Sequence, residues 1–326
     1  MLSLRARSTI VAVAFLLLGA TVSPTARAQK LPRTFELQDL SPKFWRLIDH
    51  RSNLTTVATG FGFTEGPVWD ETGSLYVSDE TLNYIFKVDV KSGQKQKVIA
   101  LGDPDGNTYD RQRRILDCAS VLRAVIRLSP DGKTYTIIAD RYQGKRFNSP
   151  NDVVLGPDGA IYFTDPTSDL PKGQKQEIPF QGVYRISKSG NVTLLTKEIG
   201  QPNGLAFSPD GKKLYIDDDQ DLNIRVYDFH PDGTISNGQI FGSEKAPERG
   251  GVPDGMRLDT HGNLYVVGPR GIWIWSPAGE HLGTIVVPEQ PANLTWGDAG
   301  YSTLYITAGT SVYRIPTKVH GFIPYQ

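Results

Sequence analysis

The sequence repeats one pattern six times. Each unit begins with an acid or amide, continues through a short apolar strand and a polar turn, and resumes with an apolar-aromatic strand. The opening residues lie 42, 44, 52, 51 and 39 residues apart, and they are Glu65, Asn107, Asn151, Asn203, Asp254 and Asn293. Units of about 40 to 50 residues that hold several short antiparallel strands are typical of propeller blades. The spacing therefore predicts six blades.

The two ends of the repeat region predict how the ring closes. Each unit adds a third strand and five have room for a fourth, but the sixth runs out of chain soon after Ile315. The segment 55–59 (TTVAT) precedes the first unit and can fill that place, so that no strand edge is left exposed. We expect an all-β, six-bladed β-propeller over 54–316, an N-terminal extension over 29–53 and a C-terminal tail over 317–326. A β-sandwich or an open β-solenoid does not explain one extra strand at the start and one missing at the end.

The first 28 residues have the pattern of a secretory signal peptide. Arg5 and Arg7 precede the apolar run 10–20, and Ala26-Arg27-Ala28 matches a small-x-small cleavage site. The run is too short to span a bilayer comfortably, although an uncleaved membrane anchor is the alternative. We expect a periplasmic or secreted protein without a membrane span after cleavage.

Composition narrows the range of partners. After removal of 1–28, the remaining 32 basic and 35 acidic side chains carry a net charge of −3, with no basic stripe that indicates nucleic acid binding. Cys118 is the only cysteine, so no intramolecular disulfide is possible, and a buried small apolar side chain is its expected role. The sequence does not indicate an oligomeric state.

The six opening residues are also the candidate site. In a propeller the first strand of each blade lines the central channel, so these residues meet at one mouth, and all six carry a side-chain oxygen. Capping of strand ends is the structural alternative. Oxygen ligands suit Ca²⁺, Mg²⁺ or Mn²⁺, whereas Zn²⁺ prefers His and Cys, and no His opens a unit. We expect one divalent metal ion, Ca²⁺ first, with Mg²⁺, Mn²⁺ or Zn²⁺ as alternatives.

Several motifs together resemble one known family. EGPVW at 65, SPNDVV at 149, PNGLAFSPDG at 202, PDGMRLD at 253 and PANLTWG at 291 are similar to the SMP-30/gluconolactonase/luciferin-regenerating family, in order along the mature chain. The resemblance implies hydrolysis of a lactone with one divalent metal. It also implies that Glu65, Asn203 and Asp254 are metal ligands and that Asn151 contacts the metal or the substrate.

Two readings of the function follow. In the first, the metal polarises a lactone carbonyl, Asp254 activates the attacking water, and Asn107, Asn151, Asn293 and Ser120 are candidates for substrate binding. In the second, the propeller is not hydrolytic, the metal is structural, and the open face binds a small ligand or a protein. A metal at an open mouth favours the enzyme. No G-x-S-x-G motif supports serine hydrolase chemistry.

Two departures from the family pattern leave the substrate open. Many members carry Cys-Glu-His in the second blade, where this chain has Cys118-Ala119-Ser120. A common Asp-Pro-Pro-Tyr-Gly stretch is here the segment 165–169, DPTSD. Both lie at the ends of second strands near the same mouth, so part of the substrate wall differs while the expected metal set is intact.

Overall fold

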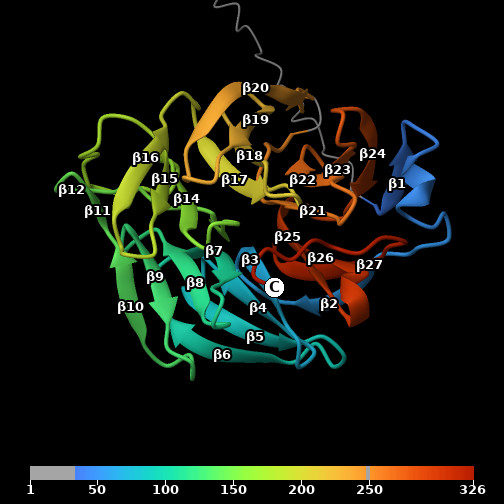
Figure 1. Cartoon of the computed structure of the whole chain (residues 1–326). Helices are drawn as coiled ribbons and strands as arrows, with labels where there is room; N and C mark the ends of the chain where they lie inside the picture. The colour runs from blue at the N-terminus through green and yellow to red at the C-terminus, as the bar shows by residue number, and fades with distance from the viewer. Residues whose placement is uncertain (1–33, 247–249) are drawn as a thin grey trace, which may run out of the picture. The chain divides into compact units, whose positions relative to one another are not determined.

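The computed structural model describes residues 34–246 and 250–326. The predicted signal peptide over 1–28 lies outside these residues. Within them, the strands form six antiparallel blades around a central channel, as Figure 1 shows. The all-β, six-bladed propeller expected from the repeat is therefore confirmed.

The first three blades follow the chain, each from its inner to its outer strand. Blade 1 contains β3 (Thr64–Asp70), β4 (Ser74–Asp79), β5 (Tyr84–Asp89) and β6 (Lys95–Ala100). Blade 2 contains β7 (Pro104–Tyr109), β8 (Ile115–Ala119), β9 (Ala124–Leu128) and β10 (Tyr135–Ala139). The hairpin β11 (Arg141–Tyr142) and β12 (Lys145–Arg146) leads to blade 3, which contains β13 (Val153–Leu155), β14 (Ile161–Asp165), β15 (Gly182–Ile186) and β16 (Val192–Thr196).

The last three blades include the strands that come from the N-terminal part of the chain. Blade 4 contains β17 (Pro202–Phe207), β18 (Lys213–Asp218), β19 (Asn223–Phe229) and β20 (Ile235–Ser243). Blade 5 contains β21 (Met256–Leu258), β22 (Leu264–Gly268), β23 (Gly271–Trp275), β24 (His281–Val286) and β1 (Glu36–Asp39). Blade 6 contains β25 (Pro291–Gly297), β26 (Thr303–Ala308), β27 (Ser311–Pro316) and β2 (Thr55–Thr59).

The ring closes as expected. β2 pairs antiparallel with β27, with Thr55 opposite Arg314 and Thr59 opposite Ser311. The predicted N-terminal extension does more than lead into the ring, because its strand β1 pairs with β24 and gives blade 5 a fifth strand. Two one-turn 3₁₀ helices, Phe44–Arg46 and Ala299–Tyr301, complete the secondary structure of the residues that the structure describes.

The hydrophobic core lies between the blades. Along the second strand of a blade, alternate side chains point to the same neighbouring blade, and Leu75 and Val77 of β4 are fully buried in this way. They pack with the buried Phe86 and Tyr305 in the cluster between blades 1 and 6. Trp69 and Tyr305 stack across this interface with ring centroids 5.5 Å apart. Each blade buries its apolar faces against its two neighbours, and closure of the ring leaves no blade with an unpaired face.

The C-terminal tail covers one mouth of the channel. Phe322 N donates to Leu258 O at the end of β21, and Val319, Ile323 and Tyr325 are buried. Figure 1 shows the C-terminal end at the centre of the ring. The first strands end at this mouth, so the residues that open them face the opposite one.

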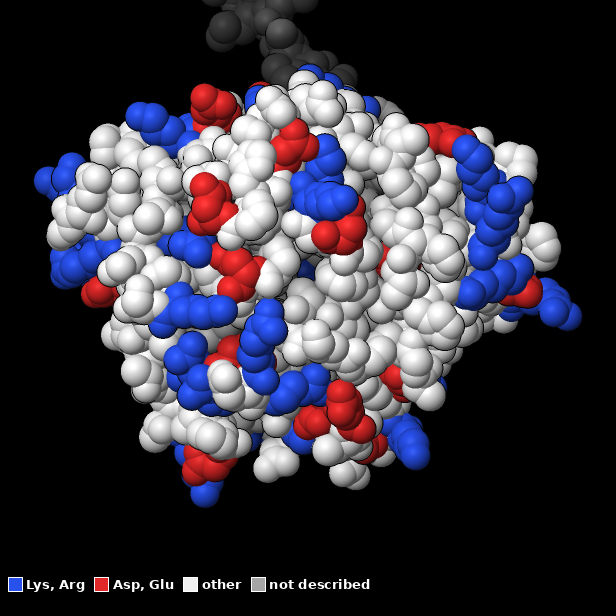
Figure 2. Space-filling view, in the orientation of Figure 1, with Lys and Arg blue, Asp and Glu red and all other residues white. Residues whose placement is uncertain are grey.

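The outer surface carries mixed charge. Figure 2 shows acidic and basic side chains interspersed over the face in view. No helix among the described residues is long and apolar enough to cross a membrane.

Candidate active site at the channel mouth

Neighbouring first strands approach very closely where they begin. Four of the six carry glycine directly after the residue at the mouth, and a Cβ on Gly66 would lie 2.1 Å from Asp105 O, one on Gly204 2.2 Å from Asp254 O, and one on Gly255 2.2 Å from Asn293 Cγ. Only glycine permits such contact. This packing brings Glu65, Asn151, Asn203 and Asp254 together at one mouth. The prediction that Asn293 opens its blade there is wrong, because Pro291 pairs with Ala308 as Pro202 pairs with Asp218, so Ala292 holds the mouth position and Asn293 the position of the glycine.

The structure adds Asp105, which the sequence analysis missed. Pro104-Asp105-Gly106 opens β7 in the same way as Pro202-Asn203-Gly204 opens β17, and Pro104 pairs with Ala119 as Pro202 pairs with Asp218. The second blade therefore presents Asp105 at the mouth, and Asn107 lies two residues further along the strand. Alignment of the glycines, rather than of the nearest amide, would have found it.

Glu65 is buried at the start of β3. Its Oε2 accepts hydrogen bonds from the backbone N of Gly66 at 2.6 Å and from Asn293 Nδ2 at 2.8 Å. Burial raises the pKa of Glu65 to about 8, and the charge of Asp152 adds to the shift. Asn293 Oδ1 accepts from Leu294 N, so both ends of the Asn293 amide make hydrogen bonds. Its Nδ2 donates to Glu65 and so fixes the position of that carboxylate.

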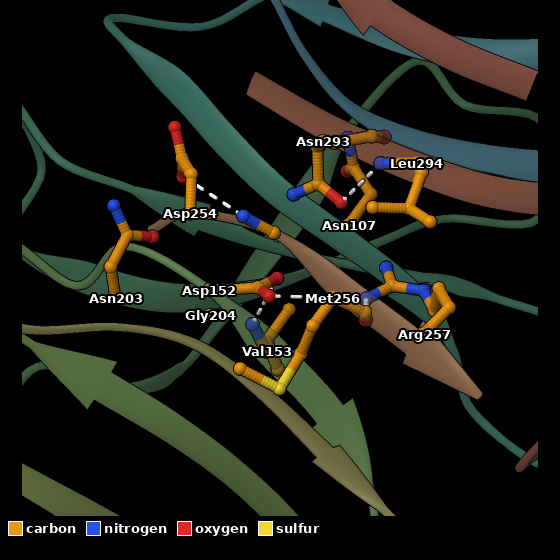
Figure 3. Close-up of polar contacts among 12 residues, drawn as sticks. Asn107, Asp152, Val153, Asn203, Gly204, Asp254, Met256, Arg257, Asn293 and Leu294 are labelled. Carbon is orange, nitrogen blue, oxygen red and sulfur yellow. Dashed lines mark hydrogen bonds and ion pairs between the residues drawn. The ribbon is translucent and has the colours of Figure 1, made fainter. Parts of the chain in front are cut away.

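Asp254 and Asn203 come from adjacent first strands, and Figure 3 shows them on the same side of the channel. Asp254 Oδ1 accepts from Gly255 N at 3.1 Å, and the side chain is partly exposed. Burial and the nearby carboxyl groups of Glu65 and Asp219 raise the pKa of Asp254 well above its usual range. Asn203 Nδ2 points to Asp219 Oδ2 at 3.4 Å, which leaves its amide oxygen open.

The remaining predicted residues lie on the second and third blades. Asn151 Nδ2 donates to Asp105 Oδ2 at 2.8 Å. Asn107 is fully buried, with Nδ2 donating to Gly66 O and Ser78 Oγ and with no hydrogen-bond partner for Oδ1 among the described residues. Ser120 is also fully buried and donates to Pro150 O at 2.9 Å, so it supports the backbone that carries Asn151. Substrate contact by Asn107, Asn151, Asn293 or Ser120 stays a prediction.

The mouth is strongly acidic. Burial raises the pKa of Glu80 to about 9, of Asp103 to about 6 and of Asp219 to about 7, and neighbouring carboxyl groups add to each shift. Arg257 is the cation that opposes the shifts of Glu65 and Asp152, and it lies 3.9 Å from Asp152 Oδ2, a contact drawn in Figure 3.

A divalent cation fits this donor set. Crowded, partly desolvated carboxyl groups repel one another, and a bound divalent charge would favour the ionised form of each. Among residues 34–246 and 250–326, no three His, Cys, Asp or Glu side chains form a metal-binding cluster by themselves. The expected set differs from such a cluster because it joins two carboxylates, Glu65 and Asp254, with the amide oxygens of Asn203 and Asn151.

Comparison with known proteins agrees with the fold and the motifs. The family model described as SMP-30/Gluconolactonase/LRE-like region matches residues 63–310. A gluconolactonase of Zymomonas mobilis is 32% identical, and the alignment covers 96% of both chains. The structure of a gluconolactonase from Xanthomonas campestris has a TM-score of 0.80 at 29% identity, covering 88% of this chain and 97% of that one. A regucalcin from Agrobacterium tumefaciens, described as a calcium-binding protein, shares the fold with a TM-score of 0.68 at 18% identity, over 82% and 95% of the two chains.

Proposed function

Because the chain belongs to the SMP-30/gluconolactonase/LRE-like family, we propose that it hydrolyses a sugar lactone of the gluconolactone type at the acidic mouth of the channel, with one divalent metal ion. The observation that carries the proposal is the alignment of the whole chain with a gluconolactonase, together with the Glu65, Asn203 and Asp254 side chains at one mouth. Export to the periplasm or the medium, as residues 1–28 suggest, is part of the proposal.

Glu65, Asn203 and Asp254 would hold the ion, with Asn151 within reach of it or of the substrate. The carboxylate and amide oxygens favour Ca²⁺, as expected from the sequence. When bound, the ion supplies a positive charge that polarises the lactone carbonyl. The amide oxygen of Asn151 is the proposed contact with the ion or with a substrate bound to it. Asn107 Oδ1 is fully buried and has no partner among the described residues, so its contact with the substrate stays a prediction from the sequence.

Asp254 is the proposed base. The carboxylate of Glu65 is almost fully buried and already accepts two hydrogen bonds at Oε2, whereas Asp254 is partly exposed and Oδ2 makes no hydrogen bond in the described structure. Water that attacks the carbonyl carbon can therefore pass its proton to Asp254 Oδ2. The ring C–O bond breaks, and the leaving alkoxide takes a proton from a second water molecule. The hydroxide left behind takes the proton from Asp254, which restores the carboxylate, and the product is a hydroxy acid.

The test is a lactone panel with and without chelator. We expect the purified mature protein to open an aldonolactone, with the reaction measured by proton release. Activity should be lost in EDTA and should recover when Ca²⁺ is restored. Asp254→Asn keeps an oxygen ligand and removes the base, so turnover at saturating metal should fall by about 10² to 10⁴. Asp228→Asn is the matched control and should leave turnover unchanged, because this half-buried carboxylate lies on the third strand of blade 4, where it pairs with Lys213.

Two results would contradict the proposal. If metal-saturated Asp254→Asn protein turns over at near-parent rate, Asp254 is a ligand and not the base. If the parent opens no lactone at any metal concentration, the chain is a propeller that binds a ligand or protein without hydrolysing it.

A further inference from the structure

Two carboxylates at the mouth have no part in the proposed reaction, yet each contacts an amide that does. Asp105 Oδ2 accepts from Asn151 Nδ2 at 2.8 Å, and Asp219 Oδ2 faces Asn203 Nδ2 at 3.4 Å. Asp105 is only 4% exposed, and Asp219 follows the end of β18 in blade 4. The same contact thus occurs twice, in different blades.

An amide side chain can present either of its two ends to a ligand. Its oxygen is an acceptor and its nitrogen is a donor, and the two ends have nearly the same shape. A cation can use only the oxygen. A carboxylate that accepts from the nitrogen decides the orientation, because the nitrogen then faces the carboxylate and the oxygen is left for the ligand.

The two carboxylates are themselves held in place. Gly66 packs against the carbonyl of Asp105, and Gly106 packs against the carbonyl of Asn151, so β7 and the start of blade 3 are fixed relative to each other. Asp219 Oδ2 also accepts from Gln201 Nε2 at 3.1 Å. Each amide therefore bonds to an acceptor whose own position is constrained.

We propose that Asp105 and Asp219 are positioning residues that orient the amide oxygens of Asn151 and Asn203 toward the metal ion. The inference rests on the metal site of the proposed function, and it adds the two residues that hydrogen-bond to the amide ligands of that site. Partners of this kind, which bond to a ligand rather than to the metal, typically change metal affinity or activity by 10- to 100-fold when removed.

The first experiment separates positioning from charge. Ca²⁺ affinity is measured by calorimetry on chelator-stripped full-length mature protein for the parent and three variants. Asp105→Ala removes charge and acceptor, and we expect a Kd about 10- to 100-fold weaker. Asp105→Asn removes the charge but keeps an acceptor oxygen. Asp103→Asn removes a charge at the same mouth from a side chain that, among the described residues, contacts neither Asn151 nor Asn203. Both should weaken binding by less than about fivefold.

The outcomes decide between roles. If Asp105→Asn binds as weakly as Asp105→Ala, Asp105 acts through its charge or as a direct ligand, and the proposal is wrong. If Asp105→Ala binds Ca²⁺ within threefold of the parent, the hydrogen bond to Asn151 has no positioning role. The melting temperature of each metal-free variant is measured in parallel, since a purely structural role would lower it without a selective loss of Ca²⁺ affinity.

A double-mutant cycle tests whether Asp105 acts through Asn151. In an Asn151→Ala background, Asp105→Ala should cause no further loss of Ca²⁺ affinity, because the amide to be oriented is gone. Additive losses would overturn the proposal. The same cycle with Asp219→Ala and Asn203→Ala keeps the idea testable if Asp105→Ala fails to fold, because Asp219 is less buried than Asp105.

Failure of this inference can be told apart from failure of the proposed function. If the parent binds Ca²⁺ and shows the predicted coupling but opens no lactone, the positioning residues stand and lactone hydrolysis does not. If the parent binds no divalent ion, both the metal site and its positioning residues are wrong.

Discussion

Asp117 offers a sharp test of how this propeller is stabilised. It is fully buried in β8, directly opposite Asn107, and neither carboxyl oxygen makes a hydrogen bond of normal geometry within the described structure. The equivalent position of the second strand holds Val77 in blade 1 and Ile216 in blade 4, both fully buried. Blade 2 thus places an acid where its neighbours place an aliphatic side chain.

Burial raises the pKa of Asp117 well above its usual range, and Ser78 and the Asp105 backbone, which lie nearby, offset only part of this shift. The protonated carboxyl is then favoured in the folded state. Its contribution to stability is present below the unfolded pKa of about 4 and is lost as pH rises above it, because the unfolded chain then gains by ionising. Asp117 therefore costs stability at neutral pH.

We expect Asp117→Val to stabilise the protein. An unsatisfied buried polar group costs about 1–3 kcal/mol, and a buried Val contributes about 1.5 kcal/mol or more. Allowing for imperfect fit, the gain at pH 7 should be about 2–4 kcal/mol, which corresponds to roughly 4–10 °C in Tm for a chain of this size. The gain should be smaller at pH 4. Differential scanning calorimetry of metal-free protein at both pH values measures it.

Two further variants sharpen the test. Asp117→Asn keeps the volume and removes ionisation, so the stability difference between Asp117→Asn and Asp117→Val should not depend on pH, while Asp117→Asn recovers only part of the gain. Val77→Asp should reproduce the cost in blade 1. The reasoning is refuted if Asp117→Val melts no higher than the parent at pH 7, or if the gain is the same at pH 4 and pH 7.

Two predictions concern the ends of the chain. A chain that begins at Gly60 lacks β1 and β2, which exposes the edges of β24 and β27, so it should melt far below the parent and aggregate on size-exclusion chromatography. A parent-like Tm would show that closure by β2 is dispensable. A chain that stops at Thr317 loses the buried Ile323 and Tyr325, and should lose about 3–6 kcal/mol of stability, measured as a lower Tm, while Ca²⁺ affinity at the opposite mouth stays within threefold. Loss of Ca²⁺ affinity in the folded truncated protein would contradict the separation of the two mouths.

The architecture could be predicted from the sequence because the repeat states one pattern several times. The pairing of β2 with β27 followed from a count of strands, since the β-branched residues of TTVAT favour a strand but do not indicate its partner. β1 escaped prediction for the opposite reason. Its sequence, ELQD, has no apolar alternation, and it becomes a strand because the outer edge of β24 offers hydrogen bonds. Such a strand is specified by its partner and not by its own residues.

The candidate site was predicted less evenly. Glu65, Asn203 and Asp254 were found because each opens a unit with a strong motif. Asp105 was missed because the second unit is the most divergent, and the amide of Asn107 gave a plausible alternative alignment. The C-terminal tail was predicted only as a leftover segment, since its contacts with Leu258 and the end of the channel are set by tertiary packing.

Two blades pack closely against their neighbours although the residue after the mouth residue is not glycine. Blade 3 has Asp152 at this position and blade 6 has Asn293, and each side chain accepts a hydrogen bond from the next backbone N at 2.8 Å. Each also faces a glycine of the preceding blade, Gly106 for Asp152 and Gly255 for Asn293, where a Cβ would come within 2.3 Å. Each of these larger polar side chains is thus accommodated by a glycine, which has no side chain, on the facing strand of the preceding blade. Because Asn293 also donates to Glu65, and Gly106 packs against the carbonyl of Asn151, the contacts that close the ring are the same contacts that set the geometry of the proposed ligands.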